Sequence, residues 1–383
     1  MRLAGASGVC LHGRRVRSPS ARIADKGAPL AFMAAFLTVA LFAPICGDHH
    51  ERDNMKTIAM FTVMSATALS STVCADSARG WGANTYQQIQ APIGASSRAL
   101  IFIDAGGEHN VAVTQGGEVL AWGKNSFGQC DVPNNIGPAG AVAAGAEFCV
   151  ARLLNGTIVC WGANDFGQCN SPVGLTSVLQ VAAGNAHAAA LRSDGTLVCW
   201  GNNNQGQCNI PLGLGSCDQI DAGANHVVVR LASGTAACWG DRTFGQCATP
   251  SDLGFVRVIS GGGSHTAALR ADGTVRCWGN NGQGQSAVPL GLVGVVGVSA
   301  GGYHTAAVRS NGTVVCWGAA GAVNQGQSVV PAGLTGARSV SAGGFHTIAL
   351  VASSQCPSDV DGSGVTDGAD LGVLLGSWGS TCP

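Results

Sequence analysis

A tryptophan-glycine pair recurs along most of the chain and determines its organisation. The pairs begin at Trp81, Trp122, Trp161, Trp200, Trp239, Trp278 and Trp317, and every step after Trp122 is 39 residues. Each full unit reads A-G-x-x-H, an alternating apolar strand, a two-residue turn and then T-V-x-C-W-G-x-N-x-x-G-Q-C. A period near 40 built from hairpins is typical of propeller blades, because one small sheet cannot bury both of its faces alone.

The turns of these hairpins are residue pairs that supply positive φ angles. They are Asn155-Gly156, Asp194-Gly195, Ser233-Gly234, Asp272-Gly273 and Asn311-Gly312. Such pairs between alternating strands are the strongest short-range hairpin signal. The composition agrees, because 58 glycines and only 11% charged residues favour short strands and tight turns over helices.

The number of motifs predicts how the ring closes. The A-G-x-x-H motif occurs seven times, each copy with at most one substitution, at His109, Phe148, His187, His226, His265, His304 and His346. No W-G strand follows His346, and no histidine strand precedes Trp81. We expect the N-terminal strand at Trp81 to complete the blade of His346 and to leave no exposed edge. The predicted fold is an all-β, seven-bladed propeller over residues 76–353.

The pattern A-G-x-x-H … D-G-x-[VL]-x-x-W-G-x-N-x-x-G-Q resembles the regulator of chromosome condensation repeat family, from Trp81 to Ala352. The resemblance implies a seven-bladed propeller and protein binding as a class. The eukaryotic namesake binds nucleosomes and exchanges nucleotide on a small nuclear GTPase. We do not carry these roles over, because this chain has export signals and an acidic propeller. Bacterial propellers with short blades resemble this chain more closely in blade length, and one of them inhibits β-lactamases by binding them.

Two apolar stretches precede the repeats. The first runs from Pro29 to Cys46 behind an arginine-rich segment, and the second begins at Met55 and ends in small residues before Asp76. The second has the form of a signal peptide. We therefore interpret residues 1–54 as a gene-model extension or extra N-terminal segment, and residues 55–75 as a signal peptide.

The mature chain from Asp76 would be a monomer without a membrane span, either secreted, on the cell surface or in the periplasm. It would carry 12 basic and 17 acidic residues, a net charge of −5. Nucleic acid is therefore not an expected partner.

The residue before each histidine differs from blade to blade. In ring order it is Phe345, Glu108, Glu147, Ala186, Asn225, Ser264 and Tyr303. An aromatic pair (Tyr303 and Phe345) beside an acidic pair (Glu108 and Glu147), on loops of one face, predicts a protein-binding patch. The alternative is ordinary loop variation.

Other repeated residues are interpreted as structural. We expect each histidine to make an internal hydrogen bond in its own blade, and the tryptophans to form the core. A second aromatic set, at Tyr86, Phe127, Phe166 and Phe244, is expected to pack under the loops.

Sixteen cysteines favour an oxidising compartment. Pairing between successive repeats is the favoured scheme and gives Cys130–Cys160, Cys169–Cys199, Cys208–Cys238 and Cys247–Cys277. Pairing within a repeat gives only three bridges and leaves Cys130, Cys277 and Cys316 over. A third alternative is that these cysteines are reduced, buried hydrophobic residues.

Residues 354–383 differ in composition from the repeats and contain a calcium-loop pattern. Oxygen ligands stand at positions 1, 3, 5, 9 and 12, a backbone carbonyl at position 7 and glycine at position 6, as calcium requires. The ligands are Asp359, Asp361, Ser363, Val365, Asp367 and Asp370. The aspartate at position 12 resembles the dockerin variant of the EF-hand loop, present here as one loop followed by a short amphipathic helix. We expect Cys356 and Cys382 to bracket it as a disulfide.

No H-E-x-x-H or phosphate-loop motif occurs in the chain. We therefore predict a non-enzymatic, exported propeller that binds an unidentified protein or cell-surface partner, with a calcium-dependent C-terminal module for anchoring or docking. One alternative is a carbohydrate-active propeller enzyme that uses Glu108 and Glu147 as acid and base. Another is a purely structural surface protein.

Overall fold

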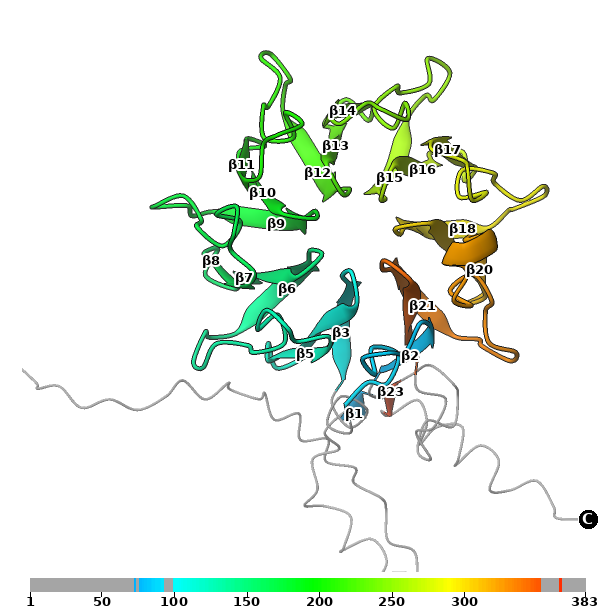
Figure 1. The fold of residues 1–383 in the computed structure, drawn as a ribbon, viewed down its shortest axis with the longest axis horizontal. Coiled ribbons are helices and arrows are strands. Elements are labelled where there is room, and N and C mark those ends of the chain that lie inside the picture. The colour runs from blue at the N-terminus through cyan, green and yellow to red at the C-terminus, as the bar shows by residue number, and fades with distance from the viewer. Residues whose placement is uncertain (1–71, 74–75, 93–98, 353–364, 367–383) are drawn as a thin grey trace, which may run out of the picture. The chain divides into compact units, whose positions relative to one another are not determined.

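The computed structural model describes residues 72–73, 76–92, 99–352 and 365–366. Seven three-stranded antiparallel sheets stand around a central axis as the blades of a propeller (Figure 1). Their strands, blade by blade, are β3 (Leu100–Ala105), β4 (His109–Thr114) and β5 (Val119–Gly123); β6 (Ala139–Ala144), β7 (Phe148–Leu153) and β8 (Ile158–Gly162); β9 (Val178–Ala183), β10 (His187–Arg192) and β11 (Leu197–Gly201); β12 (Cys217–Ala222), β13 (His226–Leu231) and β14 (Ala236–Gly240); β15 (Val256–Gly261), β16 (His265–Arg270) and β17 (Val275–Gly279); β18 (Val295–Ala300), β19 (His304–Arg309) and β20 (Val314–Gly318); and, in blade 7, β21 (Ala337–Ala342), β22 (His346–Val351) and β2 (Ser77–Gly82).

The N-terminal strand closes the ring as predicted. Strand β2 pairs antiparallel with β22, which places Trp81 opposite Thr347 and Gly82 opposite His346. In Figure 1 the blue strand β2 therefore belongs to the same blade as the orange strand β21. A short 3-10 helix, η1 (Gly321–Val323), precedes this blade, and β1 (Thr72–Val73) pairs with β23 (Val365–Thr366).

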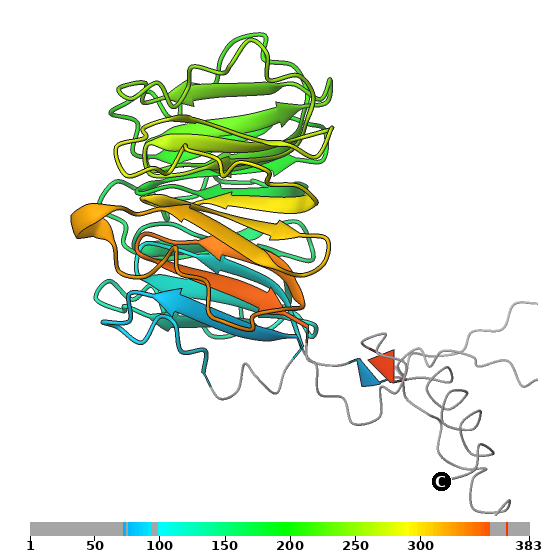
Figure 2. The same ribbon diagram turned by 90° about the vertical axis from the view of Figure 1, so that its right-hand side faces the viewer.

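Each blade presents its connections on two faces of the propeller, which are seen edge-on in Figure 2. We call one the turn face: here the four-residue motif from glycine to histidine joins the inner strand to the middle strand. The opposite face carries the tight hairpin turns between middle and outer strands, such as Asp194-Gly195. The glycine of that hairpin has φ +80, a left-handed conformation that favours glycine.

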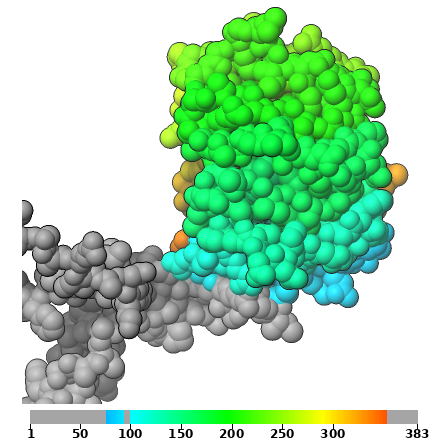
Figure 3. All heavy atoms as spheres, turned by 90° about the vertical axis from the view of Figure 1, so that its left-hand side faces the viewer, coloured from blue at the N-terminus to red at the C-terminus, as the bar shows by residue number. Residues whose placement is uncertain are grey.

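The hydrophobic core lies between neighbouring blades rather than within one. One cluster joins Val111 and Val113 of blade 1 to Val142 and Trp161 of blade 2. The seven repeated tryptophans are all buried, and each residue is only 3 to 8% exposed. The blades therefore stack into the continuous wall seen in Figure 3. Among the described residues, no helix is long and apolar enough to span a membrane.

Candidate functional site

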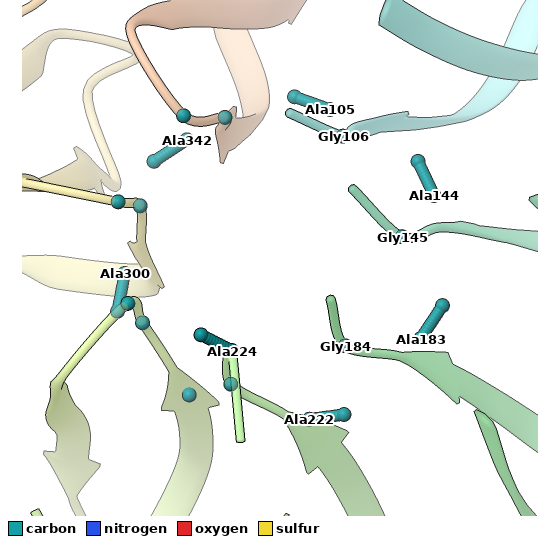
Figure 4. A pocket seen from close by; sticks show the side chains of 18 of the residues that line it. Ala105, Gly106, Ala144, Gly145, Ala183, Gly184, Ala222, Ala224, Ala300 and Ala342 are labelled. Atoms are coloured by element: carbon teal, nitrogen blue, oxygen red, sulfur yellow. The ribbon is translucent and has the colours of Figure 1, made fainter. Parts of the chain in front are cut away.

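Small residues line most of the central channel. The inner strands end in alanine and glycine, and Figure 4 shows Ala105, Ala144 and Ala183 on neighbouring strands around the opening. The space that these strand ends enclose is about 130 Å³. A Cβ on Gly184 would lie closer than 3.0 Å to the ring of His187 and to the Gly223 carbonyl of the next blade. Glycine is therefore required in the A-G-x-x-H motif.

A ring of backbone hydrogen bonds surrounds the turn-face mouth of this channel. In each blade, the N–H after the motif glycine donates to a carbonyl of the next blade. The Gly107 N–H donates to the Gly145 carbonyl (3.2 Å), and the ring closes where the Gly344 N–H donates to the Gly106 carbonyl (3.1 Å). This ring fixes the positions of the residues that precede the histidines.

The repeated histidines connect one blade to the next. His226 Nε2 lies 3.1 Å from Thr266 Oγ1, and this hydroxyl donates to the Gln246 carbonyl (2.8 Å). Because the hydroxyl donates its proton to the carbonyl, the histidine must carry its proton on Nε2. The prediction of a hydrogen bond inside each blade was wrong, because the ring nitrogen reaches across the interface.

Burial keeps these histidines neutral. Desolvation lowers the pKa of His109, His187 and His226 to about 4, and that of His265, His304 and His346 to about 3. Within the described residues, no group of three or more His, Cys, Asp or Glu side chains is arranged to hold a metal ion.

Two successive interfaces lack the histidine hydrogen bond. Blade 2 carries Phe148 in the histidine position, and Ala188 stands in blade 3 where blades 5, 6 and 7 have threonine. In blade 3, His187 has no hydrogen-bond partner for either ring nitrogen, and it is followed across the interface by Val227 instead of threonine. Blades 2, 3 and 4 are therefore joined by fewer side-chain hydrogen bonds than the others.

Two partly buried carboxylates on the channel wall, Asp104 and Asp221, were missed by the sequence analysis. Asp104 accepts hydrogen bonds from the N–H groups of Ala105 (3.0 Å) and Ala144 (2.9 Å) and from Ser341 Oγ (2.8 Å). Asp221 accepts the N–H of Ala222 (2.9 Å) and of Gly261 (3.0 Å). Asp104 thus joins blade 1 to blades 2 and 7, and Asp221 joins blade 4 to blade 5.

Burial opposes the charge on both channel carboxylates. Desolvation raises the pKa of Asp104, and it raises that of Asp221 to about 6. Because serine and alanine fill this position in the other five blades, the position shows no recognisable pattern along the chain.

All four predicted binding residues line one hollow on the turn face. This turn-face hollow has a volume of about 490 Å³ and is lined by Glu108, Glu147, Tyr303 and Phe345. The Tyr303 and Phe345 rings lie 5.2 Å apart between centroids, with an angle of 36° between their planes. Tyr303 is 37% exposed. The aromatic pair and the acidic pair therefore face the same space.

The sequence analysis missed Lys124, which lies between the two glutamates. Its Nζ is 3.2 Å from Glu108 Oε2 and 2.9 Å from Glu147 Oε1, and it lies 5.7 Å from the centre of the Tyr86 ring. The hydrogen bond to Glu147 raises the pKa of Lys124. One signal was available: Lys124 is the only lysine in residues 76–383.

The second aromatic set is exposed, so its predicted packing under the loops was wrong. Tyr86, Phe127, Phe166 and Phe244 are 41 to 53% exposed. The adjacent glutamine takes the buried position instead: Gln129 is 1% exposed, and its Oε1 accepts the Phe127 N–H (2.9 Å). This hydrogen bond folds the loop so that its aromatic residue faces outward.

The disulfides also differ from the favoured scheme. Cysteines within one repeat are bonded, Cys199 to Cys208 and Cys238 to Cys247, with Cα atoms 5.0 Å apart in both pairs. The loop after the outer strand turns back, so the second cysteine returns to its own strand. The predicted calcium ligands lie outside the described residues except Val365, which is in β23.

The fold and its repeated residues define a seven-bladed β-propeller repeat protein. The family profile of the regulator of chromosome condensation (RCC1) repeat matches six segments, residues 101–129, 141–168, 178–207, 217–246, 256–285 and 295–325. Together with the fold, these six repeats place the chain in the RCC1 repeat family. No curated protein matches the chain in sequence.

Solved structures with the same fold are distant in sequence. Prp20p from Saccharomyces cerevisiae, described with its binding to Gsp1p and histones, has a TM-score of 0.62 at 17% identity, covering 80% of this chain and 96% of that one. Yeast RCC1 (Prp20) bound to Kap60 gives 0.61 at 17%, covering 74% and 91%. Human WBSCR16 gives 0.57 at 19%, covering 67% and 88%. These likenesses establish the fold alone.

Proposed function

We propose that this protein is an interaction propeller that binds a protein segment in its turn-face hollow. The observation that carries the proposal is that an acidic pair and an aromatic pair line one concave surface. On one side stand the carboxylates of Glu108 and Glu147, and on the other the rings of Tyr303 and Phe345. The volume of about 490 Å³ lies within the range of ligand pockets.

The charge of the hollow defines the expected partner. Two carboxylates against the one ammonium of Lys124 leave a net negative charge, and the glutamates remain 31% and 34% exposed. A basic side chain of the partner would complete this cluster, while an adjacent aromatic or aliphatic side chain would pack on Tyr303 and Phe345.

The proposal includes export and calcium binding. The signal-peptide pattern of residues 55–75 supports export, and the oxygen ligands from Asp359 to Asp370 support a calcium loop. We assign this C-terminal module to anchoring or docking at the cell surface, separate from recognition by the propeller.

Affinity capture from the cell-envelope fraction tests the proposal. Full-length baits would be the wild type, an E108Q/E147Q variant and a Y303A/F345A variant, each with calcium and with chelator. The control D252N/F255A removes one acid and one aromatic residue from the opposite face, where Phe255 is 65% exposed.

A partner lost with both turn-face variants and retained by the control supports the proposal. A partner retained by both turn-face variants contradicts it. Loss on chelation alone would assign docking to the C-terminal module instead.

A further inference from the structure

Blade 2 has the same cysteine arrangement as the two bridged blades. Its first cysteine lies on the outer strand directly before the tryptophan, and its second follows nine residues later, after the Gly-Gln pair. The strand register is also the same, because Cys160 lies opposite Val150 as Cys199 lies opposite Ala189. The bridged pairs are Cys199–Cys208 and Cys238–Cys247; the blade 2 pair, Cys160 and Cys169, is present as thiols.

The loops that carry the second cysteine have matching hydrogen bonds. The Cys169 N–H donates to Asn164 Oδ1 (2.9 Å), and the Cys208 N–H donates to Asn203 Oδ1 (2.8 Å). Since the bridged Cα atoms are 5.0 Å apart, within the range for a disulfide, the same loop holds the blade 2 cysteines within bonding reach.

We propose that Cys160 and Cys169 form a third disulfide bridge in the mature protein. The two thiols lose two electrons and two protons to the disulfide of an oxidant, such as oxidised glutathione or an oxidised dithiol protein. The oxidant's disulfide is thereby reduced to two thiols. The Cys169 thiolate attacks first, and Cys160 then displaces the oxidant. The oxidant is supplied by the export that we propose, and the bridge requires no partner.

The chemistry of the two thiols sets this order. Burial raises the pKa of Cys169 to about 11 and raises the pKa of Cys160 further. The thiolate is the attacking form, so the less buried cysteine with the lower pKa reacts first.

Two of the three bridges, those of blades 2 and 3, lie at the two interfaces that lack the histidine hydrogen bond. The third, Cys238–Cys247, lies at the interface of blades 4 and 5, where His226 contacts Thr266. In blade 2, the loop ending in Cys169 contains Gln168, whose carbonyl accepts Trp200 Nε1 of blade 3 (2.9 Å). In blade 3, the bridged loop contains Gln207, whose carbonyl accepts Trp239 Nε1 of blade 4 (3.0 Å). A covalent bond that fixes each loop therefore holds a hydrogen-bond acceptor in place across a weakly joined interface.

Peptide mapping of the purified full-length protein tests the proposal directly. The protein is oxidised with glutathione disulfide, alkylated under denaturing conditions and cut with chymotrypsin without reduction. After cleavage behind Trp161 and Trp200, the two halves of each loop should remain linked. Recovery of Cys160 and Cys169 as alkylated thiols would overturn the proposal, as would a Cys169–Cys199 link.

The chain supplies its own controls for this experiment. Cys130, Cys277 and Cys316 occupy the same cysteine positions, but their partner positions hold Ala121, Ser286 and Ser328. All three should be recovered alkylated in the same digest that contains the linked loops.

A stability measurement separates a bridge with a structural role from an incidental one. The C160S/C169S variant should have a Tm about 5 °C below that of the wild type when both are oxidised, and the same Tm when both are reduced. The control C277S should follow the wild type under both conditions. An equal Tm for oxidised variant and wild type would refute the stabilising role. Because this test needs no partner, its outcome is independent of the capture experiment.

Discussion

The buried histidines predict that the propeller unfolds in mild acid. The ordinary histidine pKa is 6.5, and burial lowers the pKa values of the six motif histidines to about 3 or 4. Below pH 6.5 the unfolded chain takes up protons that the folded chain cannot accept. The free energy of unfolding must therefore decrease as the pH falls from 6.5 towards 4.

The size of this effect is comparable to the stability of a whole domain. At pH 5.5 each histidine lowers the free energy of unfolding by about 1 to 2 kcal/mol, and the six together by about 8 kcal/mol. Asp221 acts in the opposite direction, because its pKa is raised to about 6 and the folded state takes up its proton before the unfolded state does. Its protonation raises the free energy of unfolding by about 1 kcal/mol at this pH. For a typical stability of about 10 kcal/mol, unfolding is expected near pH 5.

Urea unfolding at a series of pH values, followed by tryptophan fluorescence, measures this effect. Two variants change how many blades carry a histidine at the motif position. H187F removes a histidine that has no hydrogen-bond partner, and F148H adds a histidine in the preceding blade. The pH dependence of the unfolding free energy should become shallower in H187F and steeper in F148H. Equal slopes in all three proteins, or a propeller that stays folded at pH 4, would refute the reasoning.

Three further changes test the contacts that hold the blades together, each by urea unfolding. Gly184→Ala should cost more than about 3 kcal/mol, because its Cβ would overlap fixed atoms, whereas Gly273→Ala, with open space around it and φ +83, should cost about 1 kcal/mol. Trp81→Ala should cost about 3 to 5 kcal/mol and expose the closing strand to trypsin at Arg79, because it removes a buried ring. Asp104→Ala should cost about 1 to 3 kcal/mol by leaving backbone N–H groups unpaired, and Asp104→Ser, which keeps an acceptor, should cost less than half as much.

The fold was predictable because its signals are local and repeated. The hairpin turns, the tryptophan period and the unmatched strand at Trp81 gave the blade number and the closure. The inner strands were harder to recognise, because sequences such as Leu100–Ala105 have no residue common to all blades. They were found only through the motif that follows them.

Contacts between blades were less predictable, because they depend on how repeats are placed in space. Sequence spacing favoured a bridge between Cys169 and Cys199, but the returning loop places Cys208 beside Cys199. In the same way, the four proposed binding residues were selected from their variation at one position, while Lys124 was missed. It lies on another loop and enters the site only when the blades are assembled.

The most direct test of the proposed function is a hydrogen-exchange footprint. Deuterium uptake of the full-length protein would be measured alone and with the captured partner. We expect protection of the turns that carry Tyr303, Phe345, Glu108 and Glu147, with no change at the hairpin turns of the opposite face. Protection confined to those hairpin turns, such as Asp194-Gly195, would contradict recognition at the turn-face hollow.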